Sequence, residues 1–171
     1  MNAALVRPST MVDMAAITAI YAHYVRNTTS TFELDPPAVE EMVRRRQFVL
    51  SLGLPYLVAE AEGRIVGFAY ASQYRQRAAY RFTVEDSIYV APDCSGRGIG
   101  RLLLTSLIIA CDSTPARQMI AVIADTANLT SIALHARCGF RMVGTMEDVG
   151  YKFNRWVDTV LMQLPLCDPL E

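Results

Sequence analysis

The spacing of hydrophobic positions follows two different periods along the chain, and each period predicts a type of element. Met14, Ile17, Tyr21 and Tyr24 recur every three or four residues, as on one face of an amphipathic helix. Compact runs rich in β-branched and aromatic residues, bounded by glycine or proline, predict strands instead. We expect strands over residues 3–7, 56–60, 65–72, 82–90, 119–123, 140–147 and 156–164.

Capping signals predict where the helices begin and end. Residues 10–13 have the form of a capping box, and Asp35 followed by Pro36 fits an N-cap with proline at the first helical position. Gly53 and Gly139 lie just after the expected ends of two helices, where glycine is favoured. We expect helices after residue 13, from about 36 to about 52, and over about 99–111 and 128–138.

The order of these elements predicts the fold class. It reads β-αα-βββ-α-β-α-ββ, an α/β arrangement around a mixed sheet. The chain has 171 residues, of which 52% are hydrophobic and 19% are charged, and this favours one globular domain over residues 1–171.

Charge and hydropathy exclude several classes of partner. The net charge is −1, so no strongly basic surface points to nucleic acid. No apolar run reaches the roughly 18–20 residues that span a bilayer, and the first residues lack the pattern of a signal peptide. We therefore expect a cytoplasmic protein that binds neither nucleic acid nor membrane.

The cysteines predict neither a metal site nor a disulfide framework. Cys94, Cys111, Cys138 and Cys167 share no CxxC spacing, and only two histidines accompany them in the chain. A catalytic cysteine needs an activating base, and no second motif supplies one for Cys94. We therefore expect no metal and no covalent intermediate on cysteine.

A glycine-rich segment, residues 95–101, lies between a predicted strand and a predicted helix. Glycines let a phosphate approach the backbone N–H groups, and the helix start adds the positive end of its dipole. A P-loop would end in Gly-Lys-Ser/Thr, and a dinucleotide fingerprint would have glycine in place of Arg101. A phosphate site of another kind and a turn without a ligand both remain open at this point.

Two segments resemble the signatures of the GNAT acetyltransferase superfamily. Gly98-x-Gly100 after a long strand is similar to its pyrophosphate motif, Gln/Arg-x-x-Gly-x-Gly/Ala, with Ser95 as a departure at the first position. Residues 128–140 resemble the second signature. The resemblance implies the single-domain GNAT fold, in which about four helices flank a mixed, mostly antiparallel sheet of about six to seven strands.

Shorter fragments along nearly the whole chain resemble one branch of that superfamily, the phosphinothricin and methionine sulfoximine N-acetyltransferases. They are residues 20–21, 27–29, 81–90, 149–153 and 156–158. The branch implies acetyl-CoA as cosubstrate, a small amino-acid-like acceptor attacked directly in a ternary complex, a role in detoxification, and a homodimer.

The same resemblance assigns the residues that hold acetyl-CoA. It implies that backbone groups of Ile88, Tyr89 and Val90 bind the pantetheine amides as an added strand would, with one N–H group at the thioester oxygen. It places Asn128 against the cofactor as well. The pyrophosphate site would consist of Gly96, Arg97, Gly98, Ile99, Gly100 and Arg101.

Glu85 and His135 are the candidates for proton transfer. Glu85 lies in a β-rich, aromatic segment, where burial raises a carboxyl pKa; an outward-facing strand residue or a partner of Arg81 is the alternative. A lone helix histidine such as His135 is often structural. The resemblance makes Glu85 the general base, acting directly or through water, and His135 an acid or relay base.

Arg75 matches the substrate-binding arginine of the branch, with Gln76 and Arg77 beside it and Glu85 at the same site. An arginine binds a carboxylate through two parallel hydrogen bonds, whereas the alternative is a solvated loop. Phe32 and Glu33 are expected to line the substrate pocket. Lys152 and Trp156 match the branch, but a lone tryptophan in a closing strand is more often a core residue.

Two alternatives to an amino-acid acceptor follow from the same residues. One keeps the fold and changes the acceptor to a polyamine, an aminoglycoside or a protein N-terminus. The other is a non-catalytic sensor of acyl-CoA, which would keep the glycine segment and tolerate the loss of Glu85.

Overall fold

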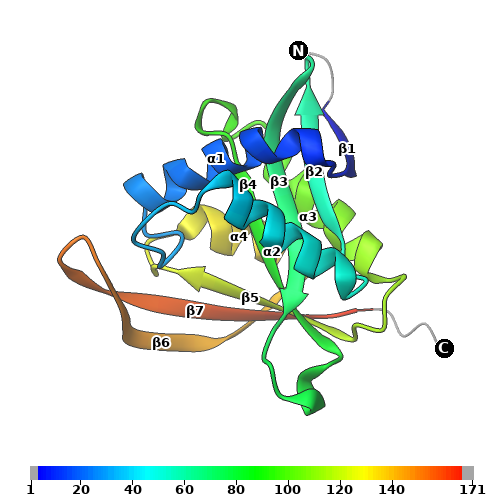
Figure 1. The fold of residues 1–171 in the computed structure, drawn as a ribbon. Coiled ribbons are helices and arrows are strands. Elements are labelled where there is room, and N and C mark those ends of the chain that lie inside the picture. Colours follow the sequence, from blue (N-terminus) through cyan, green and yellow to red (C-terminus); the bar gives the residue numbers. More distant parts are fainter. Residues whose placement is uncertain (1–3, 167–171) are drawn as a thin grey trace.

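The computed structural model describes residues 4–166, and within them seven strands form one sheet in the order β1-β2-β3-β4-β5-β7-β6 (Figure 1). The strands are β1 Leu5–Pro8, β2 Tyr56–Ala61, β3 Arg64–Gln73, β4 Thr83–Val90, β5 Gln118–Ala124, β6 Arg141–Lys152 and β7 Arg155–Pro165. Among the described residues, β4 and β5 are the one parallel pair. The mixed, mostly antiparallel sheet and the order of elements are confirmed.

Four α-helices cover the sheet over the same residues: α1 Met14–Asn27, α2 Val39–Ser51, α3 Ile99–Cys111 and α4 Leu129–Arg137. Figure 1 shows α1 and α2 in front of the sheet and α3 behind it. Leu103, Leu104 and Leu107 of α3 are fully buried against the sheet. Gly67 permits this approach, because a Cβ there would lie 2.9 Å from a methyl carbon of Leu103.

The prediction for the start of the second helix was wrong. α2 begins at Val39 with Ala38 as its N-cap, after a loop that contains both Asp35 and Pro36. Pro37 explains the difference, because the residue before a proline is disfavoured in the helical region, and this excludes Pro36 from a first helical turn.

The strand predicted over residues 140–147 is also longer than expected. β6 continues to Lys152, with a register shift against β7 between Met146 and Gly150. Asp148 takes a positive φ of 53° within this shift. The polar residues there suggest the end of a strand, but they form an irregularity within β6. In the first predicted strand, Ala3 lies outside the described residues, as does Cys167.

The sheet splits at one place, between β4 and β5. The two strands pair only where residues 83–85 of β4 meet residues 118–120 of β5. Beyond Glu85, β4 stays paired with β3 up to Val90, while β5 follows β7. The edge of β4 that faces β5 is therefore left without a neighbouring strand over residues 86–90.

Candidate active site

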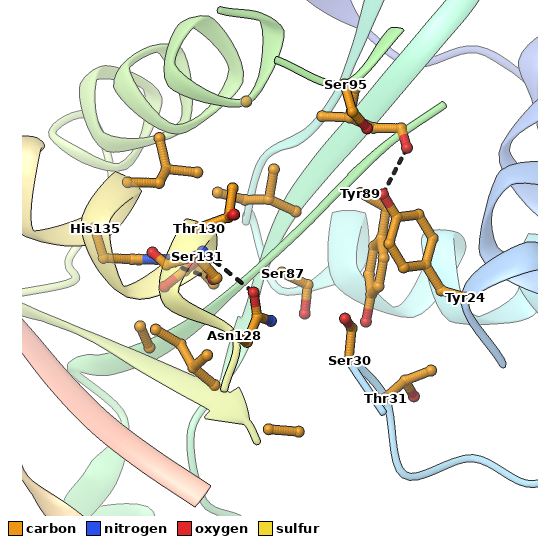
Figure 2. Close-up of a pocket in the computed structure, with 18 of the residues that line it drawn as sticks. Tyr24, Ser30, Thr31, Ser87, Tyr89, Ser95, Asn128, Thr130, Ser131 and His135 are labelled. Carbon is orange, nitrogen blue, oxygen red and sulfur yellow. Dashed lines mark hydrogen bonds and ion pairs between the residues drawn. The ribbon is translucent and has the colours of Figure 1, made fainter. Parts of the chain in front are cut away.

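A cavity of about 1010 Å³ opens where β4 and β5 separate. Its wall combines the free half of β4 with the starts of α3 and α4, the end of α1 and the loop that follows α1. Figure 2 shows that Tyr24, Ser87 and Asn128 approach this space from α1, β4 and the start of α4, respectively. The cavity therefore joins the elements that the sequence predicts to bind a phosphate and to carry out proton transfer.

Alternate residues of β4 direct their backbone groups into the cavity. The Ala91 N–H donates to the Val66 carbonyl at 2.8 Å, which fixes the alternation against β3. Ile88 and Val90 then turn their N–H and C=O groups away from β3, and the Val90 carbonyl accepts a hydrogen bond from the Tyr24 hydroxyl at 2.7 Å. Their backbone groups therefore face the cavity, and their pairing with an extended ligand stays a prediction.

Tyr89 differs from Ile88 and Val90, although the three were predicted to act alike. Its backbone pairs with Phe68 of β3, so its main chain is turned away from the opening. Its ring instead packs edge-on against Tyr21 and Tyr24 of α1, with centroids 5.0 and 5.1 Å apart. Tyr89 therefore contributes a side chain to the wall of the cavity rather than backbone groups.

The glycine segment forms a cradle at the start of α3. Gly96 and Gly98 have positive φ values of 75° and 82°, where a side chain would be strained, and Gly98 is the N-cap of the helix. The N–H groups of the first helical turn have no acceptor inside the helix. Gly100 lies so close to α4 that a Cβ would be 3.3 Å from a methyl carbon of Leu134. This cradle fits a pyrophosphate.

The charged residues of that segment divide between two spaces. Arg101 lines the large cavity together with Gly98 and Gly100. Arg97 lines a separate hollow of about 150 Å³, which also includes Arg64 and Cys94. Cys94 is buried, and its sulfur lies 3.1 Å from the Arg64 guanidinium, an arrangement that supplies no base for a cysteine nucleophile.

Asn128 closes the cavity from the opposite side. It is the N-cap of α4, and its side-chain oxygen accepts a hydrogen bond from the Ser131 N–H at 3.2 Å (Figure 2). That bond uses the oxygen and leaves the amide nitrogen available as a donor. Asn128 therefore lines the cavity with a donor to spare, and its contact with the cofactor stays a prediction.

Glu85 lies in the cavity wall on the face of β4 that carries Tyr89 and is covered by α1. The pKa of its carboxyl is raised to about 7, mainly by burial and to a lesser extent by the neighbouring Asp86, while Arg75 acts in the opposite direction. No hydrogen bond contributes to this shift. A carboxylate with a pKa near neutrality and no competing donor is suited to general base catalysis.

His135 also lines the cavity, but neither of its ring nitrogens is free. Nε2 lies 3.0 Å from a carboxylate oxygen of Asp86, and Nδ1 lies 2.8 Å from the carbonyl oxygen of Ser131. Burial lowers the pKa of His135, but the hydrogen bond and charge of Asp86 raise it more, so that it lies above its usual value. His135 therefore has no free ring nitrogen with which to protonate the CoA thiolate, as its predicted role as an acid would require.

The predicted substrate loop lies at the rim of the structure. Arg75, Gln76 and Arg77 are exposed in the connection between β3 and β4 and do not line the cavity. Arg75 is still close enough to Glu85 to lower the pKa of that carboxyl. Of the three residues, Arg75 alone is therefore linked to the site by an interaction within the described chain.

The loop between α1 and α2 is held over the cavity by residues that the sequence did not assign to this task. Lys152 of β6 is buried and donates from Nζ to the Thr31 carbonyl at 2.7 Å. The ring of Phe32 covers Gly150, where a Cβ would lie 2.4 Å from a ring carbon. Glu33, predicted to line the pocket, instead accepts hydrogen bonds from Tyr21 and Arg45.

A second anchor of this loop is Asp125, just after β5. It accepts a hydrogen bond from the Thr29 hydroxyl at 2.9 Å, forms an ion pair with Arg155, and accepts from the Ala127 N–H at 3.0 Å. Its φ of 73° is unusual for a residue other than glycine. In the sequence, the only signal of this anchor is the dipeptide Asp125-Thr126 after a predicted buried strand.

Trp156 is not a core residue. It is 60% exposed on β7 and packs edge-on against Tyr151 of β6.

Within residues 4–166, none of the helices is long and apolar enough to cross a membrane. In the same part of the chain, no cluster of three or more His, Cys, Asp or Glu side chains is arranged to hold a metal ion.

Comparison with known proteins places this geometry in a family. The acetyltransferase (GNAT) domain model matches residues 6–161. Phosphinothricin N-acetyltransferase from Alcaligenes faecalis is 56% identical over 154 residues, which are 90% of this chain and 78% of that protein. L-methionine sulfoximine/L-methionine sulfone acetyltransferase from Salmonella typhimurium is 37% identical over 94% of both chains.

A solved structure agrees with these relatives. The crystal structure of a GNAT superfamily phosphinothricin acetyltransferase from Sinorhizobium meliloti, in complex with AcCoA, matches with a TM-score of 0.93 and 45% sequence identity. The match covers 98% of this chain and 91% of that one.

Proposed function

The chain belongs to the GNAT acetyltransferase family, and from this premise we propose that it transfers the acetyl group of acetyl-CoA to the amino group of phosphinothricin, methionine sulfoximine or a similar small amino acid. The observation that carries the proposal is one cavity that holds both the glycine cradle and Glu85. The names of the relatives supply the class of acceptor.

Acetyl-CoA fits the open half of β4 and the start of α3. The pyrophosphate binds the N–H groups of the first turn of α3, with Arg101 beside it. The pantetheine arm pairs with the backbone of Ile88 and Val90, in the place that β5 would occupy if it continued alongside β4. The acyl group then lies beside the free half of β4, near Glu85.

The reaction is a direct attack of the acceptor amine on the thioester carbonyl. Glu85 takes the proton of the substrate ammonium, directly or through water, so that the nitrogen lone pair becomes available. A backbone N–H group of β4 stabilises the charge that develops on the carbonyl oxygen. The carbon–sulfur bond then breaks, and the departing CoA thiolate takes up the second proton, which the nitrogen loses as it becomes an amide.

We also propose that the protein is a cytoplasmic homodimer that detoxifies amino-acid analogues. The outer strand β6 supports the dimer, because it carries several exposed apolar side chains at the edge of the sheet. These residues are Met142, Val143, Met146 and Val149. The relatives named for phosphinothricin and methionine sulfoximine support the role in detoxification.

Release of CoA thiol in the presence of acetyl-CoA tests the proposed function. Phosphinothricin, methionine sulfoximine, other amino acids, a polyamine and an aminoglycoside should be compared as acceptors. Turnover confined to the amino-acid group supports the proposal, and turnover confined to the polyamine or aminoglycoside contradicts the acceptor class. No turnover with any amine, despite tight CoA binding, supports the non-catalytic sensor instead.

The activity should depend on pH through Glu85. Its carboxylate is the active form, so kcat/KM should rise with pH and level off above an apparent pKa near 7. An unperturbed glutamate, whose pKa lies near 4.3, would leave the rate flat across this range. The measurement is kcat/KM from about pH 5.5 to about pH 9 with the best acceptor, with protein stability checked at each pH.

Arg75→Ala should raise the KM for the acceptor by about tenfold and leave the KM for acetyl-CoA unchanged, because a charge-assisted hydrogen bond contributes about 1.5–3 kcal/mol. Arg81→Ala is the matched control, since Arg81 lies in the same connection but stacks over Phe82. Steady-state kinetics with each substrate varied in turn provide the measurement. Equal effects on the two KM values would contradict a role in holding the acceptor carboxylate.

A further inference from the structure

The pair formed by His135 and Asp86 is the most deeply buried set of ionisable side chains at the site. His135 is 4% exposed and Asp86 is 8% exposed. They belong to α4 and β4, and their hydrogen bond joins the helix to the strand across 49 residues of sequence. The ring of Phe140 packs edge-on against His135 at 5.0 Å and helps to keep water from the pair.

The hydrogen bonds of His135 fix the number of protons on the pair. A backbone carbonyl only accepts, so the contact with Ser131 requires a proton on Nδ1. The contact between Nε2 and the Asp86 carboxyl requires one further proton, on one side or the other. In either arrangement the pair has no net charge, and His135 has no nitrogen lone pair directed at the cavity.

Asp86 and Glu85 are adjacent in β4 and lie on opposite faces of the sheet, so the two carboxyl groups are close without touching. Around Asp86, α4 presents His135 and α3 presents Cys111, whose pKa burial raises to about 12, so that this thiol is neutral. Around Glu85, β3 presents Tyr70 and the following loop presents Arg75. Burial raises the pKa of the Tyr70 phenol as well, so it is neutral too.

The charges that act on Glu85 are therefore few. Arg75 favours the carboxylate form of Glu85, and an unpaired Asp86 carboxylate would oppose it. The proton that Asp86 shares with His135 offsets this repulsion from the far side of the sheet.

We propose that His135 is a positioning residue, which keeps Asp86 in a net-neutral pair and so spares the Glu85 carboxylate the repulsion of a second buried charge, and that it is not the proton donor to CoA. The inference rests on the proposed function, because it concerns the base of the same reaction. It predicts that turnover depends on the net charge of the pair and not on the imidazole itself.

Three variants separate these two properties. His135→Gln leaves Asp86 unpaired, so the acid limb of the kcat/KM profile should move up by about one pH unit. Asp86→Asn also leaves no net charge on the pair, so the same limb should stay close to its wild-type position. The double variant Asp86→Asn/His135→Gln has a neutral pair again, and its kcat should return to within about threefold of wild type.

The double variant also guards against misfolding. A single buried, unpaired carboxylate destabilises a protein strongly, whereas replacing both partners of a buried pair is often tolerated. If His135→Gln does not fold, Asp86→Asn and the double variant still decide the question. Circular dichroism and acetyl-CoA binding by calorimetry establish that each variant is folded.

The overturning result is a double variant that binds acetyl-CoA normally and has lost its turnover. A second overturning result is an Asp86→Asn profile in which the alkaline limb falls toward neutral pH, as expected if a protonated His135 were the acid. Either result leaves the proposed function intact, because wild-type turnover is measured alongside. Absence of wild-type turnover with every amine contradicts the proposed function instead.

Discussion

Replacing Glu85 by glutamine should lower kcat by roughly 100- to 10,000-fold and leave acetyl-CoA binding unchanged. Glutamine keeps the shape of the side chain and cannot accept the proton of the substrate ammonium. Because burial raises the pKa of Glu85, the ionised carboxylate opposes folding as pH rises from the ordinary glutamate range to about 7. This group should therefore make the free energy of unfolding of the wild type fall over that pH range, and Glu85→Gln should be spared that fall.

The control for this variant is Glu147→Gln, the same change at an exposed position of β6. It should leave kcat and stability unchanged. Single-turnover measurement of thiol release separates chemistry from product release. A Glu85→Gln enzyme that retains more than about a tenth of wild-type kcat would show that water or another group takes the proton.

Replacing Gly100 by valine should weaken acetyl-CoA binding on the order of 100-fold, because charge-assisted hydrogen bonds of about 1.5–3 kcal/mol each are lost at the pyrophosphate. Even a Cβ at this position lies 3.3 Å from Leu134. The branched side chain then moves the first turn of α3 away from α4 and from the ligand.

Gly144→Val is the matched control, since a Cβ at Gly144 has no atom within 4 Å. Calorimetric titration with acetyl-CoA provides the measurement, and circular dichroism checks that both variants are folded. Unchanged affinity in Gly100→Val would mean that the start of α3 does not hold the pyrophosphate.

The sequence was most informative where short-range signals act alone. The bounds of α3 match the prediction, because Gly98 starts the helix and the apolar run that follows has no competing interpretation. For Glu85 the residue pattern left a buried base and an outward-facing strand residue both open, and the family resemblance favoured the base. The start of α2 was missed because two consecutive prolines impose opposite preferences on one helical turn.

Long-range contacts account for most of what could not be predicted. His135 was recognised as a candidate residue, but its role depends on Asp86, which lies in another element. Lys152 and Thr31 are 121 residues apart, so no local pattern reveals their hydrogen bond. Nor does a local pattern show that the backbone groups of Tyr89 face β3 while those of its neighbours face the cavity.

The contact between Phe32 and Gly150 has a consequence for how the acceptor pocket diversifies. Any side chain added at position 150 overlaps the ring of Phe32, and a smaller residue at position 32 alone leaves a gap over the glycine. Either single change alone should therefore destabilise this contact, so a change at one position is expected to require a compensating change at the other. Variants that accept bulkier amino acids should then be reached more readily by changing both of these residues together than by altering Glu85 or the glycine cradle.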